Sequence, residues 1–235
     1  MKNKFKEIYK PFDLNHHKFK TIYNYLNWLF KDFNFVGKKV LDVGGGKGLC
    51  SYFSMYKGAK SCSNLEPFLA GSSGAFIDNT INDLKVSYIN KTFQDFEAES
   101  KFDIITMHDT INHLDEDVYI KLDKDHNSKI IYNELVHKMN ILLNKNGLIL
   151  VSDCAKSNFF GDLGLKSPFA PSIEWHLHQN PNILVEIFKS NGFELISKRW
   201  SPFKRFGIFG FLISKFGFLP SYFMQSHFNL VFRKK

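Results

Sequence analysis

Glycines alternate with other residues directly after a short apolar segment in the first quarter of the chain. The segment Lys39–Val43 is typical of a β-strand, and Gly44, Gly46 and Gly48 follow it. Glycine adopts positive φ easily and lets the backbone contact a ligand, so this spacing predicts a tight turn beneath a nucleotide-like molecule. Asp42 lies just before the turn, where a carboxylate would repel a pyrophosphate and attract an ammonium group. The pattern therefore favours a cationic ligand with a nucleoside part.

Histidines and carboxylates follow two of the later predicted strands. One strand, 102–107, runs directly into a His-Asp pair, and another, 148–152, is followed by a long segment that contains a His-Leu-His run. In open α/β sheets, ligands gather at the carboxyl ends of the strands. A histidine with a pKa near neutrality can remove a proton from a reacting group. The candidate catalytic residues are His108, Asp109, His113, His176 and His178.

The His-Leu-His run also suggests a metal hypothesis. On an extended segment both imidazoles would point in the same direction, so His176, His178 and Asp153 could hold a divalent metal, with Asp109 or His113 as further ligands. We nevertheless expect no metal, because spacing along the chain does not show that these side chains converge. The three cysteines lack the paired spacing of a zinc site or a disulfide framework, which fits a reducing cytoplasm.

Strand and helix patterns alternate through the rest of the chain, which predicts a parallel sheet with crossover helices. The expected strands are 39–43, 61–66, 86–90, 102–107, 148–152, 193–200 and 227–233, and the expected helices are 47–57, 69–82, 128–143 and 181–190. Asn146-Gly147 is a stop signal for the third of these helices, and Asn180-Pro181 is a start signal for the fourth.

A further helix is expected before the first strand. It begins at Asp13 or Asn15 and runs to about Phe33, with apolar residues at intervals of three and four. A doubly wound domain begins with its first strand, so this helix is an N-terminal addition that covers the sheet or a ligand. We expect one domain overall, with residues 1–36 as a helical cap and residues 37–235 as the α/β unit.

Glu66 ends the second predicted strand, about two dozen residues after the first acid, where a carboxylate can accept both hydroxyls of a ribose. With the Asp-x-Gly-x-Gly-x-Gly turn, this placement resembles the class I S-adenosylmethionine-dependent methyltransferases. The resemblance implies a doubly wound, mostly parallel seven-stranded α/β sheet with an antiparallel last strand. It also implies a cofactor site made of Asp42, Gly44, Gly45, Gly46, Glu66, Thr92, Phe93, Asp95 and His108.

Adenine recognition in this family falls in the loop after the third strand. Counting from the strand selects Thr92 and Phe93, whereas the chemistry of the exocyclic amine selects Asp95. We favour Phe93 with a backbone contact and keep Asp95 as the side-chain candidate.

Composition limits the partners of the protein. The formal net charge is +8, from 31 basic and 23 acidic residues among 235, but the lysines are scattered and no nucleic-acid motif occurs. We therefore expect no nucleic acid. No segment reaches the roughly 20 apolar residues needed to cross a bilayer, so we expect a cytoplasmic protein.

An unusually apolar insert lies between the last two predicted strands. Residues 203–220 carry many phenylalanines within the longer insert 201–226. Three interpretations stay open: packing on the N-terminal helix as part of a lid, a homodimer interface, or shallow insertion into a membrane surface through residues 203–220.

The expected function is methyl transfer from S-adenosylmethionine to a small molecule or glycan unit. Oxygen is the favoured acceptor atom, because a histidine-rich rim suits deprotonation. A membrane-peripheral methyltransferase of a lipid or quinone precursor and a non-catalytic binding protein are the alternatives. A nicotinamide-dependent oxidoreductase would need the longer Gly-x-Gly-x-x-Gly spacing, which this turn lacks.

Overall fold

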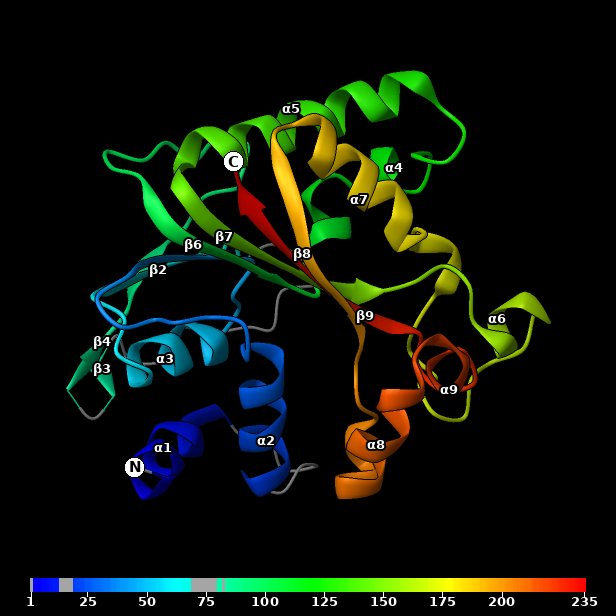
Figure 1. Ribbon diagram of the computed structural model, residues 1–235, viewed down its shortest axis with the longest axis horizontal. Coiled ribbons are helices and arrows are strands. Elements are labelled where there is room, and N and C mark those ends of the chain that lie inside the picture. The colour runs from blue at the N-terminus through cyan, green and yellow to red at the C-terminus, as the bar shows by residue number, and fades with distance from the viewer. Residues whose placement is uncertain (1, 13–18, 69–79, 82) are drawn as a thin grey trace.

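A seven-stranded sheet runs through the molecule (Figure 1). The computed structural model describes residues 2–12, 19–68, 80–81 and 83–235. In spatial order the strands are β5 (Ser87–Ile89), β2 (Ser61–Leu65), β1 (Lys39–Val43), β6 (Phe102–His108), β7 (Leu143–Cys154), β9 (His227–Lys234) and β8 (Phe193–Trp200). The first five are parallel, and β9 is antiparallel to both of its neighbours. The predicted fold class is confirmed.

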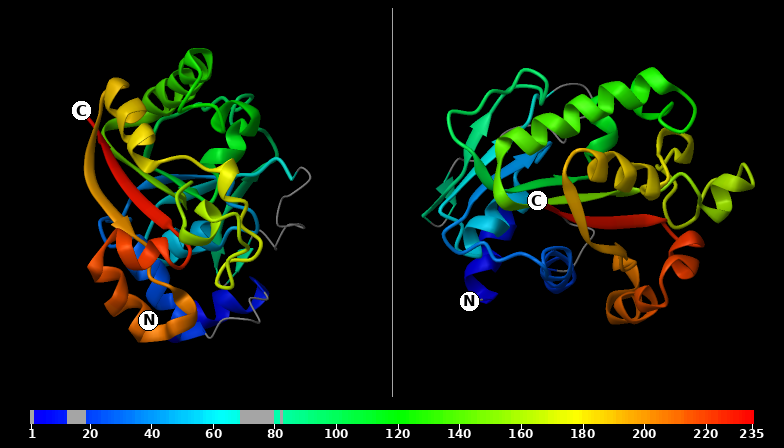
Figure 2. Two further views of the ribbon diagram at one scale, coloured as in Figure 1. Left: turned by 90° about the vertical axis from the view of Figure 1, so that its right-hand side faces the viewer. Right: turned by 45° about the horizontal axis from the view of Figure 1, so that its top comes forward.

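Helices cover both faces of this sheet, as Figure 2 shows from two further sides. One face packs against α5 (His126–Leu142) and α7 (Pro181–Ser190), and the other against α1 (Lys2–Tyr9), α2 (Phe19–Leu29) and α3 (Leu49–Tyr56). Successive strand residues point to opposite faces, so Leu41 belongs to the first core and Val40 to the second. Burial on both sides explains why most residues of the central strands are apolar.

Side-chain caps fix the starts of α5 and α7, the two helices that cover one face of the sheet. The Asp125 carboxylate accepts from the backbone N–H of Ser128 at 2.8 Å at the start of α5. The Asn180 side chain accepts from the N–H of Asn182 at 2.9 Å, and Pro181 opens α7. The helix predicted over 181–190 is confirmed.

The N-terminal region differs from its prediction. The helix expected up to Phe33 ends at Leu29, and a turn follows. Its predicted start lies within 13–18, outside the described residues. The short helix α1 was not predicted, because only Phe5 and Ile8 mark its buried side between lysines.

Two other predictions are corrected. The helix expected over 69–82 lies mostly outside the described residues, but Thr80–Ile81 forms β3, which pairs with β4 (Leu84–Lys85). Helix α5 confirms the helix predicted over 128–143 to within two residues, but the predicted stop signal, Asn146-Gly147, lies beyond its end. These two residues lie in an irregular start of β7, where the register shifts between Phe102 and Ile104. Asn146 has a φ of 62°, so the Asn-Gly pair bends the strand instead of ending the helix.

Shorter elements complete the fold. They are α4 (Glu116–Tyr119), α6 (Phe159–Asp162) and the 3-10 turns η1 (Lys10–Phe12), η2 (Ile111–Leu114) and η3 (Trp175–Leu177). The insert between β8 and β9 forms η4 (Lys204–Phe206), α8 (Gly207–Ile213), η5 (Ser214–Phe216) and α9 (Phe218–Tyr222). Among the described residues, the structure contains no helix with the length and apolarity required to cross a bilayer.

Candidate active site

The glycine turn lies between β1 and α3, beside the point where the strand order reverses. Gly44, Gly46 and Gly48 have φ values of 64°, 51° and 87°, the left-handed region that glycine favours. A Cβ at Gly44 would come within 2.2 Å of the Thr110 side chain. The turn therefore has space for backbone only, as a site for a closely approaching ligand requires.

Asp42 lies beneath this turn and is 1% exposed. Its two carboxylate oxygens accept from the Ser51 hydroxyl at 2.6 Å and from the Thr106 hydroxyl at 2.7 Å. Burial raises the pKa of the carboxyl, and these two hydrogen bonds oppose the rise. Because the Asp42 carboxylate is buried beneath the turn, it would attract the ammonium group of a ligand from below and not by direct contact.

Glu66 follows β2 and reaches across to the same turn. Its Oε2 accepts from the Gly46 N–H at 2.9 Å, and its Oε1 accepts from the Phe68 N–H at 3.1 Å. A carboxylate offers about four lone-pair directions and only accepts, which is the chemistry that the hydroxyls of a ribose require. Asn64, two residues before Glu66, donates to the Gly46 carbonyl at 3.1 Å, while its own Oδ1 is buried and has no hydrogen-bond partner among the described residues. The residues present fit a nucleoside with free ribose hydroxyls.

The side chains of the loop predicted to recognise adenine are buried or bonded to one another. Phe93 is 3% exposed and belongs to the core, so its ring presents little surface to a ligand. Thr92 and Asp95 bond to one another, with 2.6 Å between the hydroxyl and the carboxylate, and Asp95 is exposed. A backbone contact at Phe93 stays a prediction.

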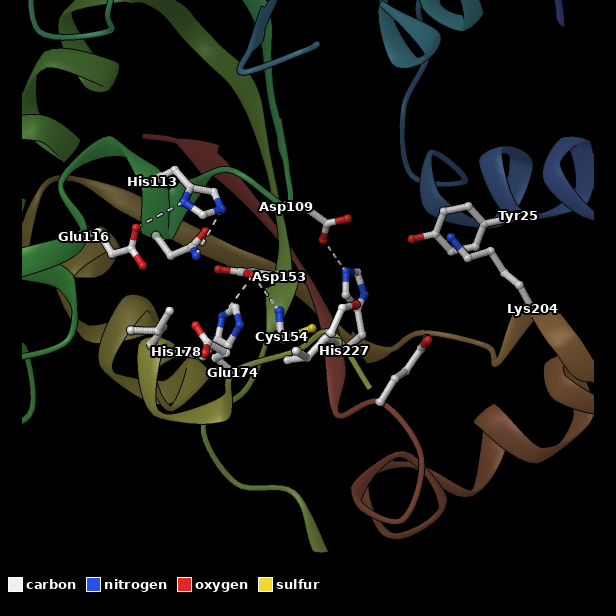
Figure 3. A pocket seen from close by; sticks show the side chains of 15 residues that line it. Tyr25, Asp109, His113, Glu116, Asp153, Cys154, Glu174, His178, Lys204 and His227 are labelled. Carbon is white, nitrogen blue, oxygen red and sulfur yellow. Dashed lines mark hydrogen bonds and ion pairs between the residues drawn. The ribbon is translucent and has the colours of Figure 1, made fainter. Parts of the chain in front are cut away.

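A second site opens beside the turn, as a cavity of about 510 Å³. It lies over the ends of β6 and β7 and the start of β9, and Figure 3 shows its walls. The residues that face it include Asp109, Asp153, His178, Lys204 and His227. Strand ends, the long segment after β7 and the insert thus meet around one polar space.

A hydrogen-bonded chain of five side chains crosses one wall of this cavity. Asp109 contacts His227 Nε2 through Oδ1 at 2.6 Å and His108 Nδ1 through Oδ2 at 3.0 Å. The far nitrogens of these rings bond to Ser201 Oγ at 2.6 Å and to Tyr25 Oη at 2.9 Å. Because an ionised carboxylate only accepts, both imidazoles donate to Asp109. Burial raises the pKa of Tyr25 well above its usual value, so its hydroxyl stays protonated and donates to His108.

Asp109 occupies an unusual backbone position at the centre of this chain. Its φ is 55°, in the left-handed region that aspartate and asparagine tolerate better than most residues. Desolvation alone would raise its pKa, but His108 and His227 hold the pKa of the carboxyl well below its usual range. The side chain is 55% exposed toward the cavity, so Asp109 is an anion that a ligand can reach.

A second acid–histidine pair lies across the cavity. The ring Nδ1 of His178 is 3.4 Å from Oδ1 of Asp153, and both side chains are nearly buried. Oδ1 also accepts from the Cys154 N–H at 2.7 Å, whereas Asp153 Oδ2 and His178 Nδ1 have no hydrogen-bond partner in the described part of the chain. A third pair, His113 and Glu116, lies 3.6 Å apart and is more exposed.

The structure does not bring His176 into the cavity. Trp175–Leu177 forms the 3-10 turn η3, so the alternation of an extended segment is lost and His176 points to solvent. The proposed ligand set Asp153, His176 and His178 is therefore wrong in one member. Cys154 is the residue that approaches the other two, with ligand atoms of the three within 4.8 Å of one another.

His108 also differs from its expected place. Both of its ring nitrogens are bonded, and its side chain is 20% exposed behind Asp109 rather than facing the cavity. To act as a base, His108 would have to break the hydrogen bond between its Nε2 and the Tyr25 hydroxyl.

Sequence reasoning missed four contributors to this site: Tyr25, Ser201, Lys204 and His227. Lys204 lies 4.3 Å above the Tyr25 ring, and burial lowers its pKa while Asp109 opposes the shift. A lone histidine at the start of the last predicted strand was the one available signal for His227. The others come from the N-terminal helix and the insert, whose positions over the sheet no local pattern reveals.

Comparisons with known proteins agree with this geometry. A family model described as a methyltransferase domain matches residues 14–198. No curated protein sequence gives a significant match. Solved structures with a similar fold include an S-adenosylmethionine-dependent methyltransferase from Mesorhizobium loti (TM-score 0.59, 12% identity, 89% of this chain and 98% of that chain). Magnesium protoporphyrin IX methyltransferase from Synechocystis PCC 6803 with bound S-adenosylmethionine is another (TM-score 0.52, 13% identity, 92% and 79%).

A third similar structure covers the whole of this chain. It is the 1,6-didemethyltoxoflavin-N1-methyltransferase from Burkholderia thailandensis with its substrate and S-adenosylhomocysteine bound (TM-score 0.55, 12% identity, 100% of this chain and 87% of that chain). At these identities the likeness concerns the fold.

Proposed function

The chain belongs to the family of S-adenosylmethionine-dependent methyltransferase domains, and we propose that it methylates a hydroxyl group of a small polar molecule or glycan unit. Bound S-adenosylmethionine supplies the methyl group from its sulfonium, as the bond from sulfur to carbon breaks and its electron pair stays on sulfur. The glycine turn and Glu66 are the residues that would hold the nucleoside. The cavity beside them is where the acceptor would bind.

The observation that carries this proposal is the convergence of three acid–histidine pairs on one cavity. Asp109 pairs with His227, Asp153 with His178, and Glu116 with His113, and all six side chains face the same space (Figure 3). Carboxylates accept and imidazoles both accept and donate, so together they match the many hydroxyls of a polyol or sugar. An apolar acceptor would leave these polar groups desolvated and unpaired.

His178 is the residue best arranged to remove the proton. When Asp153 accepts from Nδ1–H, the lone pair of Nε2 becomes available to an acceptor hydroxyl in the cavity. The 3.4 Å contact is long, and catalytic hydrogen bonds often tighten only when the substrate is bound. His178 would take up the proton of the acceptor hydroxyl and release it to solvent.

An acceptor screen tests the substrate class. Purified protein is incubated with S-adenosylmethionine and with sets of sugars and polyols, amines, and thiols, and methylated products are identified by mass spectrometry. We expect transfer to hydroxyl acceptors, with an activity that rises with the number of hydroxyl groups. Transfer confined to amines or thiols would reject oxygen methylation and leave the methyltransferase assignment intact.

A lipid or quinone precursor is the second candidate acceptor. The observation that favours it is the insert, where Lys204 faces the cavity while neighbouring Ile208 and Phe209 are 73% and 68% exposed. A long apolar acceptor could then lie along the insert with its polar head among the acid–histidine pairs. Activity on detergent-dispersed lipid extracts, with none on soluble sugars, would favour this candidate.

We expect the protein to work in a reducing compartment such as the cytoplasm. Cys50, Cys62 and Cys154 are all free thiols in the structure. Cys62 and Cys154 are buried, which suits thiols with no oxidised partner. We expect no nucleic acid as a partner of the protein.

A further inference from the structure

The insert between β8 and β9 is firmly attached to the rest of the molecule. Phe203 is 5% exposed and packs against Phe169, in the segment after β7, with ring centroids 5.5 Å apart. A Cβ at Gly210 would come within 2.1 Å of the Phe203 carbonyl oxygen, so α8 approaches this backbone as closely as glycine allows. Phe218 packs on Trp200 with centroids 4.6 Å apart. The exposed side chains of the insert are therefore held in place rather than carried on a loose loop.

The opposite side of the insert is apolar and faces solvent. Among the described residues, fourteen large hydrophobic side chains are exposed, and eight of them lie in this insert or directly after it. They are Phe206, Ile208, Phe209, Leu212, Phe216, Phe218, Leu219 and Phe223, with exposures from 41% to 79%. Scattered exposed residues need no explanation, but eight exposed apolar side chains within one short segment indicate an interaction surface. We call these eight residues the aromatic face.

The charged residues within the insert all have one sign. Residues 203–223 contain Lys204, Arg205 and Lys215 and no aspartate or glutamate. Arg205 and Lys215 are exposed beside the apolar residues. The whole chain carries a formal net charge of +8. Apolar and aromatic side chains flanked by basic ones are the composition of helices that bind in the interface of anionic membranes.

From this arrangement we infer that the aromatic face docks on the surface of an anionic lipid membrane. A second copy of the chain is a poorer occupant, because a twofold contact would bring Arg205 and Lys215 toward their own copies without an acid in the insert to pair with them. The short helices α8 and α9 lie on the surface of the fold, so the contact is shallow and interfacial (Figure 1).

The docked orientation would place the cavity next to the lipid. Lys204 near the start of the insert and Gln225 near its end both line the cavity. Membrane binding would therefore bring the mouth of the acceptor site to the lipid headgroups. The docking inference itself needs no particular acceptor, since it concerns binding alone.

Vesicle flotation of the full chain tests the inference. The vesicles are phosphatidylcholine mixed with phosphatidylglycerol, or phosphatidylcholine alone. We expect binding to the anionic vesicles and weaker binding at high salt. The double substitution Ile208→Asp with Phe209→Asp should lower the partition coefficient by at least about tenfold, since two apolar side chains lose their burial. Arg205→Glu with Lys215→Glu should lower it by at least about fivefold.

Matched controls come from the opposite face of the sheet. Ile130→Asp with Ile131→Asp changes two adjacent exposed apolar residues of α5, and Lys121→Glu with Lys124→Glu changes two exposed lysines near α4. Neither control should change vesicle binding. Binding of S-adenosylhomocysteine by calorimetry verifies that every variant is folded.

Three outcomes would overturn the inference. In the first, the wild-type protein is folded but binds neither kind of vesicle. In the second, the Ile208→Asp and Phe209→Asp double variant binds vesicles as strongly as the wild type. The third is a dimer in solution that this pair dissociates, with no vesicle binding, which would make a second copy the occupant. None of these results depends on methyl transfer, so each leaves the proposed function to its own test.

Discussion

The cofactor turn and the acceptor cavity lie at the same edge of the sheet, but different ranges of the chain build them. Asp42, the glycines and Glu66 lie within about two dozen residues. Side-chain hydroxyls hold the Asp42 carboxylate, and backbone N–H groups hold that of Glu66. The cavity instead unites Tyr25, Asp109, His178 and His227, which come from four distant segments. A local motif can therefore identify the cofactor site, whereas the acceptor site exists only after the sheet and insert have assembled. Substitutions in one region should leave the other intact.

The largest expected effect concerns the glycine turn. Gly44→Ala forces a Cβ to within 2.2 Å of the Thr110 side chain at a φ of 64°. Left-handed strain costs about 1–2 kcal/mol and the steric clash about 1–3 kcal/mol, so affinity for S-adenosylhomocysteine should fall roughly 30-fold or more. Calorimetric titration measures the affinity.

Gly37→Ala is the matched control for this substitution. Gly37 has a φ of 73°, but a Cβ added there would meet nothing within 4 Å, so alanine adds strain without a clash. This variant should lose stability and keep cofactor affinity. An equal loss of affinity in both variants would show that strain alone, and not the close packing of the turn, weakens binding.

The second effect concerns catalysis in the cavity. His178→Ala removes the proposed base, and turnover should fall about 10²- to 10⁴-fold while affinity for S-adenosylhomocysteine stays the same. His176→Ala, two residues away in the exposed turn η3, should retain wild-type turnover. Single-turnover kinetics with the best acceptor of the screen gives the comparison. Comparable losses in the two variants would contradict the assigned roles.

The contrast between the two regions also explains what could be predicted from the sequence. The strands and the turn follow from local periodicity and glycine spacing, so the fold class was correct. His176 was placed wrongly because a 3-10 turn replaces the extended segment that the alternation suggested. His227 and Lys204 were missed because their function depends on contacts with Asp109 and Tyr25, more than a hundred residues away.

A smaller effect is expected at Asp109, where the two histidines converge. The depressed pKa means that ionised Asp109 stabilises the fold above the ordinary aspartate pKa, about 4, and that this contribution is lost as the pH falls from there toward the folded-state value. Asp109→Asn keeps the left-handed backbone but removes the charge. Its unfolding free energy should therefore fall less steeply than that of the wild type below about pH 4.

Acid denaturation monitored by circular dichroism makes this measurement. Asp95→Asn is a suitable control, because this exposed carboxylate lies in the loop after β5, outside the cavity. Parallel pH dependences in the wild type and the Asp109→Asn variant would show that the histidines do not stabilise the charged form.

The smallest effect should come from Lys204, which belongs to the insert and also lines the cavity. Lys204→Met keeps the length of the side chain but removes the ammonium group 4.3 Å from the Tyr25 ring. A cation–π contact contributes about 0.5–2 kcal/mol, so the KM for the acceptor should rise a few-fold with little change in kcat or cofactor affinity. Steady-state kinetics with either substrate varied separates these quantities. If cofactor affinity fell instead, the insert would support the cofactor site as well, and the two regions could no longer be treated as independent.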